Sequence, residues 1–470
     1  MIALSLAELR DELGAELYGG DPEAIVSGSV QTDSRLVEPG SVFFALPGSV
    51  TDGHRFVSAA VAAGAAVVVA ERRVDVAVPV LVVRDGVEAL AALARLVVAR
   101  VRALGRMRVV AVTGSNGKTT TKNLLRAILA AEGPTVAPEG SFNNQVGAPI
   151  SMLRVDEATE YLIVEMGASF VGDIARLIGI VTPDIGIVLK VGLAHAGGFG
   201  GIEQTQRAKS EMVTDLPATA VALLNADDPR VDAMAAVTAA RIVRFGLDAR
   251  ADVGAGDVRA TAAGTSFTVH ADGTALPVTL RILGEHHVGN ALAALASARE
   301  FGIPLERAVA AIETVPRAER WRMELLAGAP EIGDGRVTVI NDAYNASPDS
   351  TAAALKTLAQ IAEPGQRTVA VLGHMAELGE YETEEHDRLG RLAVRLNIGQ
   401  LVVVGEGARA IHQAASLEGS WDGESVYVPD AEAAYDLLRA ELRAGDVVLV
   451  KSSKSAGLRH LGDRIAGVTA

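Results

Sequence analysis

The stretch from residue 109 to residue 120 constrains the fold of this chain more than any other. It reads VVAVTGSNGKTT: an apolar run, a glycine turn, and the beginning of a helical pattern that continues to residue 131. A strand that enters a tight turn and opens a helix presents backbone N–H groups and the positive end of the helix dipole to an anion. The pattern therefore predicts a phosphate-binding loop in an α/β domain built on a parallel sheet.

The side chains of this loop suit a nucleoside triphosphate. Lys118 supplies a positive charge for the β- and γ-phosphates, and the Thr119 hydroxyl is a suitable ligand for Mg²⁺. Val112 stands where the usual eight-residue pattern has its first glycine, so a plain glycine turn is the alternative. We expect ATP to bind here through the loop residues Gly114, Ser115, Asn116, Gly117, Lys118, Thr119 and Thr120.

Apolar runs alternate with helical patterns on both sides of the loop. The runs at 161–165, 185–190 and 220–225 end in polar or glycine residues, as parallel strands do when they lead into functional loops. Similar runs follow Pro316 and predict a second open parallel sheet. We expect an α/β protein of three domains: a small N-terminal α/β module in residues 1–105, a central parallel-sheet ATP-binding domain in 106–316, and a C-terminal Rossmann-like domain in 317–470.

Composition excludes several classes of protein. The chain has no cysteine, which rules out a disulfide framework and a thiolate metal site. Its formal net charge of −15 disfavours general binding of nucleic acid or of anionic membranes. The longest apolar run, residues 56–70, is shorter than the roughly 18 residues that a membrane span needs, and the charged start at 1–17 is unlike a signal peptide. We expect a cytoplasmic monomer that neither enters a membrane nor binds nucleic acid.

Three polar residues downstream of the loop are candidates for the chemistry. Glu165 ends an apolar run, and a carboxylate at the carboxyl end of a parallel strand faces the ligand crevice, where it can hold Mg²⁺. His195 lies in a glycine-rich segment, and Lys209 lies in the helical pattern QRAKSEM. From these residues alone the alternatives are a solvated strand-end acid, a structural histidine, and a surface lysine paired with a nearby glutamate.

Together these residues resemble the Mur ligase family of bacterial cell-wall synthesis. The family's phosphate loop reads Gly-(Thr/Ser)-Asn-Gly-Lys-Thr, without the first glycine of the usual pattern, which accounts for Val112. Three further blocks carry the resemblance: TDSR at 32–35 with DGH at 52–54, SFNNQVG at 141–147, and NDAYNASPDS at 341–350. The last block is most similar to the branch of the family that joins D-Ala-D-Ala to UDP-MurNAc-tripeptide with ATP.

The resemblance implies a role for individual residues. Thr119 and Glu165 would bind one Mg²⁺, and His195 with a carbamylated Lys209 would help to hold a second. The catalytic set would be Lys118, Glu165, His195 and Lys209. Asn290 would contact adenine, and Arg322 and Asp342 would lie near the ribose and phosphates of ATP, with Arg320 as a competing match for Arg322. The substrate-binding residues would be Thr32, Asp33, Ser34, Arg35, Asp52, His54, Asn143, Asn144, Tyr344 and Asn345.

The resemblance also implies a reaction. A carboxylate would attack the γ-phosphate of ATP to give an acyl phosphate, and the amine of D-Ala-D-Ala would then form the amide through a tetrahedral intermediate. We expect the C-terminal domain to close over the central one, because an exposed acyl phosphate would hydrolyse. The chain departs from the family pattern at three positions, with Lys190 and His287 in place of asparagine and Gln145 in place of an acidic residue.

Two alternatives stay open at this point. A sister ligase, similar to MurE or to folylpolyglutamate synthetase, would share the central chemistry but use another amine. The block around Tyr344 and Asn345 argues against it. A P-loop ATPase without ligase activity would need Lys118 and Thr119, but it would not need Glu165, His195 and Lys209 together.

Overall fold

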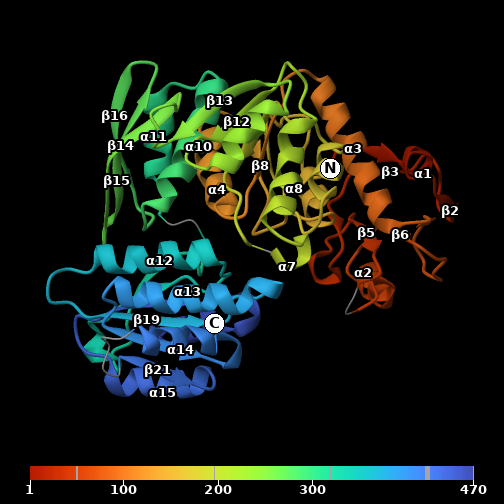
Figure 1. The fold of residues 1–470 in the computed structure, drawn as a ribbon. Helices are drawn as coiled ribbons and strands as arrows, with labels where there is room; N and C mark the ends of the chain where they lie inside the picture. The colour runs from red at the N-terminus through yellow and green to blue at the C-terminus, as the bar shows by residue number, and fades with distance from the viewer. Residues whose placement is uncertain (49–50, 195, 317–318, 419–423, 469–470) are drawn as a thin grey trace.

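The computed structural model describes residues 1–48, 51–194, 196–316, 319–418 and 424–468. Three open sheets follow one another along the chain, each with its own helices (Figure 1). The chain passes from one sheet to the next between residues 103 and 108 and again between 313 and 324. These two changes support domain boundaries at 105 and 316, which stay proposals. Within the described ranges no helix is long and apolar enough to cross a membrane.

The N-terminal part holds a five-stranded sheet of order β2-β7-β6-β5-β4, with β2 as its antiparallel edge, beside a two-stranded β1–β3 ribbon. Its elements are β1 (Leu4–Ser5), α1 (Leu6–Leu13), β2 (Glu16–Tyr18), β3 (Ile25–Val26), β4 (Val30–Gln31), β5 (Val42–Ala45), α2 (Val57–Ala62), β6 (Val67–Ala70), β7 (Val80–Val82) and α3 (Gly86–Ala103).

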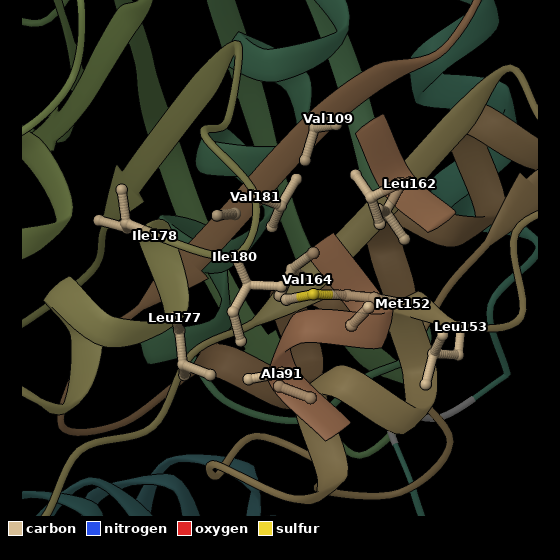
Figure 2. Packing of buried hydrophobic residues seen from close by; sticks show 14 of the residues in the cluster. Ala91, Val109, Met152, Leu153, Leu162, Val164, Leu177, Ile178, Ile180 and Val181 are labelled. Carbon is tan, nitrogen blue, oxygen red and sulfur yellow. The ribbon is translucent and has the colours of Figure 1, made fainter. Parts of the chain in front are cut away.

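Helix α3 joins this part to the central sheet through one continuous apolar core. Ala91 of α3 faces Met152, Val164 and Leu177, which come from three elements of the central part (Figure 2). Each side chain of this set is at most 3% exposed. The sequence boundary at 105 therefore separates two sheets but cuts through one shared core, while a second cluster that includes Phe43 and Val68 belongs to the N-terminal part alone.

The central sheet has nine strands in the order β16-β15-β14-β13-β12-β11-β8-β10-β9. Strands β9 to β14 pair in parallel, and β14 to β16 form an antiparallel extension where the sequence is rich in Gly and Thr. The elements are β8 (Arg108–Thr113), α4 (Lys118–Ala130), β9 (Thr135–Val136), α5 (Gly147–Met152), β10 (Tyr161–Glu165), α6 (Asp173–Ile178), β11 (Ile185–Val188), α7 (Ala196–Phe199), α8 (Ile202–Thr214), β12 (Val221–Asn225), α9 (Pro229–Asp232), β13 (Arg241–Gly246), β14 (Val253–Thr261), β15 (Gly264–Ala271), β16 (Thr274–Leu280), α10 (His286–Glu300) and α11 (Leu305–Glu313).

The C-terminal sheet has six strands in the order β17-β18-β22-β19-β20-β21, and only the edge strand β17 is antiparallel. Helix α12 faces the central part (Figure 1) and contacts β14. The elements are β17 (Glu324–Ala327), β18 (Thr338–Asn341), α12 (Pro348–Ile361), β19 (Thr368–Gly373), α13 (Glu382–Arg395), β20 (Gln400–Val404), α14 (Arg409–Leu417), β21 (Ser425–Val428), α15 (Ala431–Glu441), β22 (Val447–Lys451) and α16 (Leu458–Ile465).

The predicted α/β class and the two large open sheets are confirmed. The predicted helix after the phosphate loop is α4, and its apolar face of Leu124, Leu125, Ile128 and Leu129 is buried as its spacing indicated. The sequence did not reveal the antiparallel edge strand β17, because its four residues show no alternation that separates a strand from a linker.

Candidate active site

The phosphate loop lies at the carboxyl end of β8 in the nine-stranded sheet. It follows β8, the third strand from the β9 edge of that sheet, which lies between β10 and β11, and the Ser115 N–H donates to the Lys190 carbonyl across the strand ends at 2.8 Å. Gly117 has φ 88°, and a Cβ at this position would lie 2.3 Å from the Asn290 side-chain oxygen. Glycine is therefore required at 117 both by backbone conformation and by the close approach of α10.

Lys118 begins α4 and lies over the loop. Its Nζ donates to the Gly114 carbonyl at 2.7 Å. Burial lowers the pKa of Lys118, the negative charge of Glu165 opposes this, and the positive charge of Arg322 adds to it. These three groups are therefore close enough to act on one another electrostatically, and Lys118 and Arg322 together make the pocket favourable for an anion.

Glu165 lies where the sequence placed it, at the carboxyl end of β10. Its side chain is completely buried and lines a cavity of about 390 Å³ together with Lys118 and Thr119. One carboxylate oxygen accepts a hydrogen bond from Asn143 Nδ2 at 2.7 Å, and the other has no partner in the described part of the chain. A buried carboxylate oxygen without a partner is costly unless a ligand binds it, so the site fits a hard cation.

The protein donors alone do not complete a metal shell. No group of three or more His, Asp or Glu suited to a metal occurs among the described residues. Thr119, which is 4% exposed, lines the same cavity as Glu165 and supplies a hydroxyl oxygen. The donor set therefore fits a Mg²⁺ ion that shares its shell with nucleotide phosphates and water, as this ion usually does.

Lys209 is not a surface residue. It lies in α8 and is 2% exposed, and burial lowers the pKa of its amine to about 7. The charge of Lys118 lowers this pKa further, whereas Glu211 and Asp173 raise it. A lysine that is half neutral at pH 7 has the uncharged amine that carbamylation by CO₂ requires. His195, the other expected ligand of a second ion, lies outside the described residues.

One wall of the cavity comes from the N-terminal turn of α10. Asn290 is buried there, and its Nδ2 lies 3.1 Å from His287 Nδ1. Burial holds the pKa of His287 well below its usual range, so the ring is neutral and its Nε2 has no described partner. The His287 ring therefore replaces an asparagine of the family pattern with an uncharged group that still reaches Asn290.

Another part of the lining comes from the C-terminal part. The Arg322 guanidinium lies 4.1 Å from the centre of the Tyr344 ring and donates to the Ser141 hydroxyl at 3.1 Å. Arg320 instead pairs with Asp463, and Arg322, not Arg320, lines the cavity.

The backbone around Arg322 is strained. Trp321 and Met323 have φ values of 61° and 49°, a region that non-glycine residues rarely occupy. Asp342 supports this turn by accepting from the Met323 N–H at 3.0 Å. Such strain persists only where the surrounding structure fixes it, and here it aims the Arg322 side chain at the cavity.

Lys451 is a residue of the site that the sequence patterns did not single out. This lysine ends β22, is 2% exposed, and donates to the Asp342 carboxylate at 2.5 Å and to the Asn345 carbonyl at 3.0 Å. It lines the cavity and holds two of the predicted ligand-binding residues in place. The signal that could have found it was a lysine directly after the apolar run VVLV, at the same kind of strand end as Glu165.

A second cavity of about 570 Å³ lies beside the first and shares Tyr344 and Asn345 with it. Ala194 of the central part lines it together with residues of the C-terminal part. Its charged lining residues are Glu377, Lys454 and Arg459.

The substrate-binding residues predicted in the N-terminal part lie away from both cavities. Asp33 caps the short turn that begins at Ser34 and pairs with Arg35. Asp52 accepts from His54 Nδ1 at 2.6 Å, and the other ring nitrogen of His54 accepts from the Glu71 N–H. These contacts shape two loops, and the binding role of Thr32, Asp33, Ser34, Arg35, Asp52 and His54 stays a prediction.

Asn143 and Asn144 differ from each other in the structure. Asn143 lines the cavity through its contact with Glu165, whereas the Asn144 side chain accepts from the Val146 and Gly147 N–H groups at the start of α5. The binding role of Asn144 therefore stays a prediction as well.

Lys122 ties the central helix α4 to the segment that carries Arg322. It is 2% exposed, and its amine donates to the Pro138 and Gly140 carbonyls and to Glu319.

Replacing Lys122 with methionine would leave these acceptors without their donor. We expect the free energy of unfolding to fall by about 3 kcal/mol, measured by urea denaturation. Arg126→Met, an exposed change on the same helix, serves as the control, and an equal loss in both variants would contradict the assigned role.

Three family models match the chain in the order of its three sheets. They are described as Mur ligase family, catalytic domain, over residues 28–107, Mur ligase middle domain, over 112–298, and Mur ligase, glutamate ligase domain, over 321–454. The chain belongs to the Mur ligase family. The resemblance that the phosphate loop and the later blocks indicated is thus confirmed.

Curated relatives match over nearly the full length. The chain is 46% identical over 506 aligned positions to the UDP-N-acetylmuramoyl-tripeptide–D-alanyl-D-alanine ligase of Mycobacterium tuberculosis, covering 99% of this chain and 98% of that protein. It is 32% identical to the Escherichia coli protein of the same name, with 98% of each covered.

Solved Mur ligase structures have the same fold. MurF from Acinetobacter baumannii matches with a TM-score of 0.88 at 30% identity over 99% of both chains. MurF ligase from Thermotoga maritima, solved in complex with ADP, matches with a TM-score of 0.80 at 27% identity, covering 93% of this chain and 97% of that one. A folylpolyglutamate synthase from M. tuberculosis shares the fold alone, at 16% identity and a TM-score of 0.60.

Proposed function

We propose that this Mur ligase joins D-Ala-D-Ala to UDP-MurNAc-tripeptide with ATP, forming UDP-MurNAc-pentapeptide for peptidoglycan synthesis. The observation that carries the proposal is Glu165, a buried carboxylate with an unpartnered oxygen in the cavity that also holds Lys118 and Thr119. The full-length relatives named for this reaction support the choice of substrates.

The reaction must bring two anions together. The terminal carboxylate of the tripeptide attacks the γ-phosphate, and ADP leaves as the acyl phosphate forms. Lys118 from the phosphate loop and Arg322 from the C-terminal part both line the cavity, and their positive charges lower the repulsion between the reacting groups. Mg²⁺ bound by Thr119 and Glu165, with a second ion near His195 and carbamylated Lys209, would supply further charge stabilisation.

The amine of D-Ala-D-Ala then attacks the acyl carbon, and phosphate leaves from the tetrahedral intermediate. We place the dipeptide in the second cavity, because that cavity adjoins the first through Tyr344 and Asn345. Lys454 and Arg459 suit its carboxylate, and Glu377 is the one acidic lining residue suited to its ammonium. Residues from two domains line both cavities, so closure of these domains would keep water from the acyl phosphate.

The remaining assignments belong to the same proposal. Asn290 would contact adenine, Asp342 would lie near the ribose, and the N-terminal module would hold the uridine nucleotide through residues 32–35 with Asp52 and His54. The enzyme would act in the cytoplasm as a monomer, without binding nucleic acid. A sister ligase with another amine stays the second candidate, since the folylpolyglutamate synthase fold is shared.

Phosphate release tests the proposal directly. Purified protein with ATP, Mg²⁺ and UDP-MurNAc-tripeptide should release phosphate at a rate that rises at least tenfold when D-Ala-D-Ala is added, with the pentapeptide detected by mass spectrometry. Glutamate and diaminopimelate serve as controls for sister ligases. Release that the dipeptide leaves unchanged would contradict the proposal, and release without any acceptor substrate would indicate a simple ATPase.

A further inference from the structure

Lys190 is a departure from the family pattern that the proposed reaction does not explain. It lies just beyond β11, and its carbonyl accepts from the Ser115 N–H, so its backbone is part of the support of the phosphate loop. Its amine reaches across the domain boundary and donates to Asp349, in the first turn of α12, at 3.1 Å. The pair is partly exposed, at 43% for the lysine side chain and 33% for the aspartate.

A second contact joins the same two elements. Ser347, the N-cap of α12, donates from its hydroxyl to the Asn116 side chain of the phosphate loop at 3.1 Å. The Asp349 carboxylate also packs on Gly192, where a Cβ would lie 2.3 Å from one of its oxygens. The Gly192 N–H and carbonyl both bond to the Ser115 hydroxyl. The N-terminus of α12 is thus docked on the phosphate loop and on the loop's own support.

The position of α12 matters for the rest of the C-terminal wall. Tyr344, Asn345 and Asp342 lie on the short segment between β18 and α12. A helix held at its first turn fixes the end of that segment, so the docking of α12 sets how these residues meet the nucleotide.

We propose that Lys190 and Asp349 form the ion pair that docks the C-terminal domain on the phosphate loop, and that both are positioning residues for ligation. The inference rests on the proposed function, because the docked state is the one that shields the acyl phosphate. Without the pair, the domains separate more often and more acyl phosphate is hydrolysed by water before the amine attacks.

The alternative is that Lys190 binds nucleotide phosphates directly and that Asp349 only neutralises it. The two ideas predict opposite signs for Asp349→Asn. If the pair docks the domain, this variant has a higher KM for ATP and releases a larger fraction of phosphate without amide formation. If Lys190 binds phosphate, freeing it from its aspartate lowers the KM for ATP, and this result would overturn the inference.

A double-mutant cycle tests whether the two residues act through each other. Lys190→Met and Asp349→Asn should each reduce kcat/KM for ligation about fivefold, as suits a partly exposed pair, and the double variant should show about the same fivefold reduction. Independent effects that multiply to about 25-fold would contradict the inference. Glu432→Gln, which breaks a more exposed pair with Arg464 inside the C-terminal domain, should leave kcat/KM unchanged.

Distance measurements separate this inference from the proposed function. The chain has no cysteine, so spin labels attach only to introduced ones, here Arg126→Cys on α4 and Gln413→Cys on α14, which are both exposed. In the full-length protein with ADP, Asp349→Asn should broaden the distance distribution relative to the labelled parent. If the distance distribution is unchanged, and the two substitutions act independently in the double-mutant cycle, the docking role is overturned. Absence of dipeptide-dependent phosphate release in the parent would instead contradict the proposed function.

Discussion

Replacing Lys209 with alanine is expected to lower the ligation rate by roughly 100- to 1000-fold, the size of effect seen when one preorganised charge-stabilising group is removed from an active site. The expectation follows from a lysine that is 2% exposed and has a pKa of about 7. Short carboxylates such as formate or acetate should restore part of the rate, because they fit the space left by the side chain and supply the missing oxygens. Lys356→Ala, an exposed lysine on α12, is the matched control.

The same residue predicts a pH dependence with a definite sign. Only the neutral amine reacts with CO₂, and the pKa of Lys209 lies well below its ordinary value of 10.5 because the amine is buried. Between pH 6 and pH 8 the neutral fraction rises, so the carbamate and the ligation rate should rise together. Carbon-13 NMR with labelled bicarbonate measures the carbamate. A Lys209→Ala variant as active as the parent, or no carbamate at pH 8, would refute the assignment.

Replacing Glu165 with glutamine is expected to move activity and stability in opposite directions. Glutamine keeps an oxygen for Asn143 but lacks the charge that would hold Mg²⁺ in the proposed function, so kcat should fall roughly 100- to 1000-fold. Without nucleotide and metal, the same change removes a buried charge with an unpartnered oxygen, and the free energy of unfolding should rise by about 1 kcal/mol. Urea denaturation with and without ATP and Mg²⁺ measures the second effect.

The outcomes for Glu165→Gln are distinct. A variant that is less active and also less stable in the absence of ligands would show that Glu165 serves the fold and not the metal. Asn143→Ala provides the matched control, because it removes the other half of the hydrogen bond and leaves the charge in place. It should lower stability and leave the dependence of the rate on Mg²⁺ unchanged.

The central chemistry of this protein could be predicted from its sequence. Strand, glycine turn and helix occur within twelve consecutive residues at 109–120, so local physics was enough to predict the phosphate loop. Glu165 could be identified as a candidate, because a carboxylate at the carboxyl end of a parallel strand faces the ligand crevice, but a solvated strand-end acid stayed an alternative until the structure showed it buried. Lys209 needed the family resemblance, since nothing in its helical pattern distinguished a buried lysine from a surface one.

Only the folded structure shows which residues of the C-terminal part complete the site. Lys451 and Asp342 meet although they are 109 residues apart, and Lys190 meets Asp349 across 159 residues. Arg322, and not Arg320, lines the cavity because of a strained turn that no local sequence pattern predicts. Spacing along a chain fixes which side chains share a helix face or a strand end, but contacts between domains depend on how whole sheets and helices pack, and that is set by the sum of many distant apolar contacts.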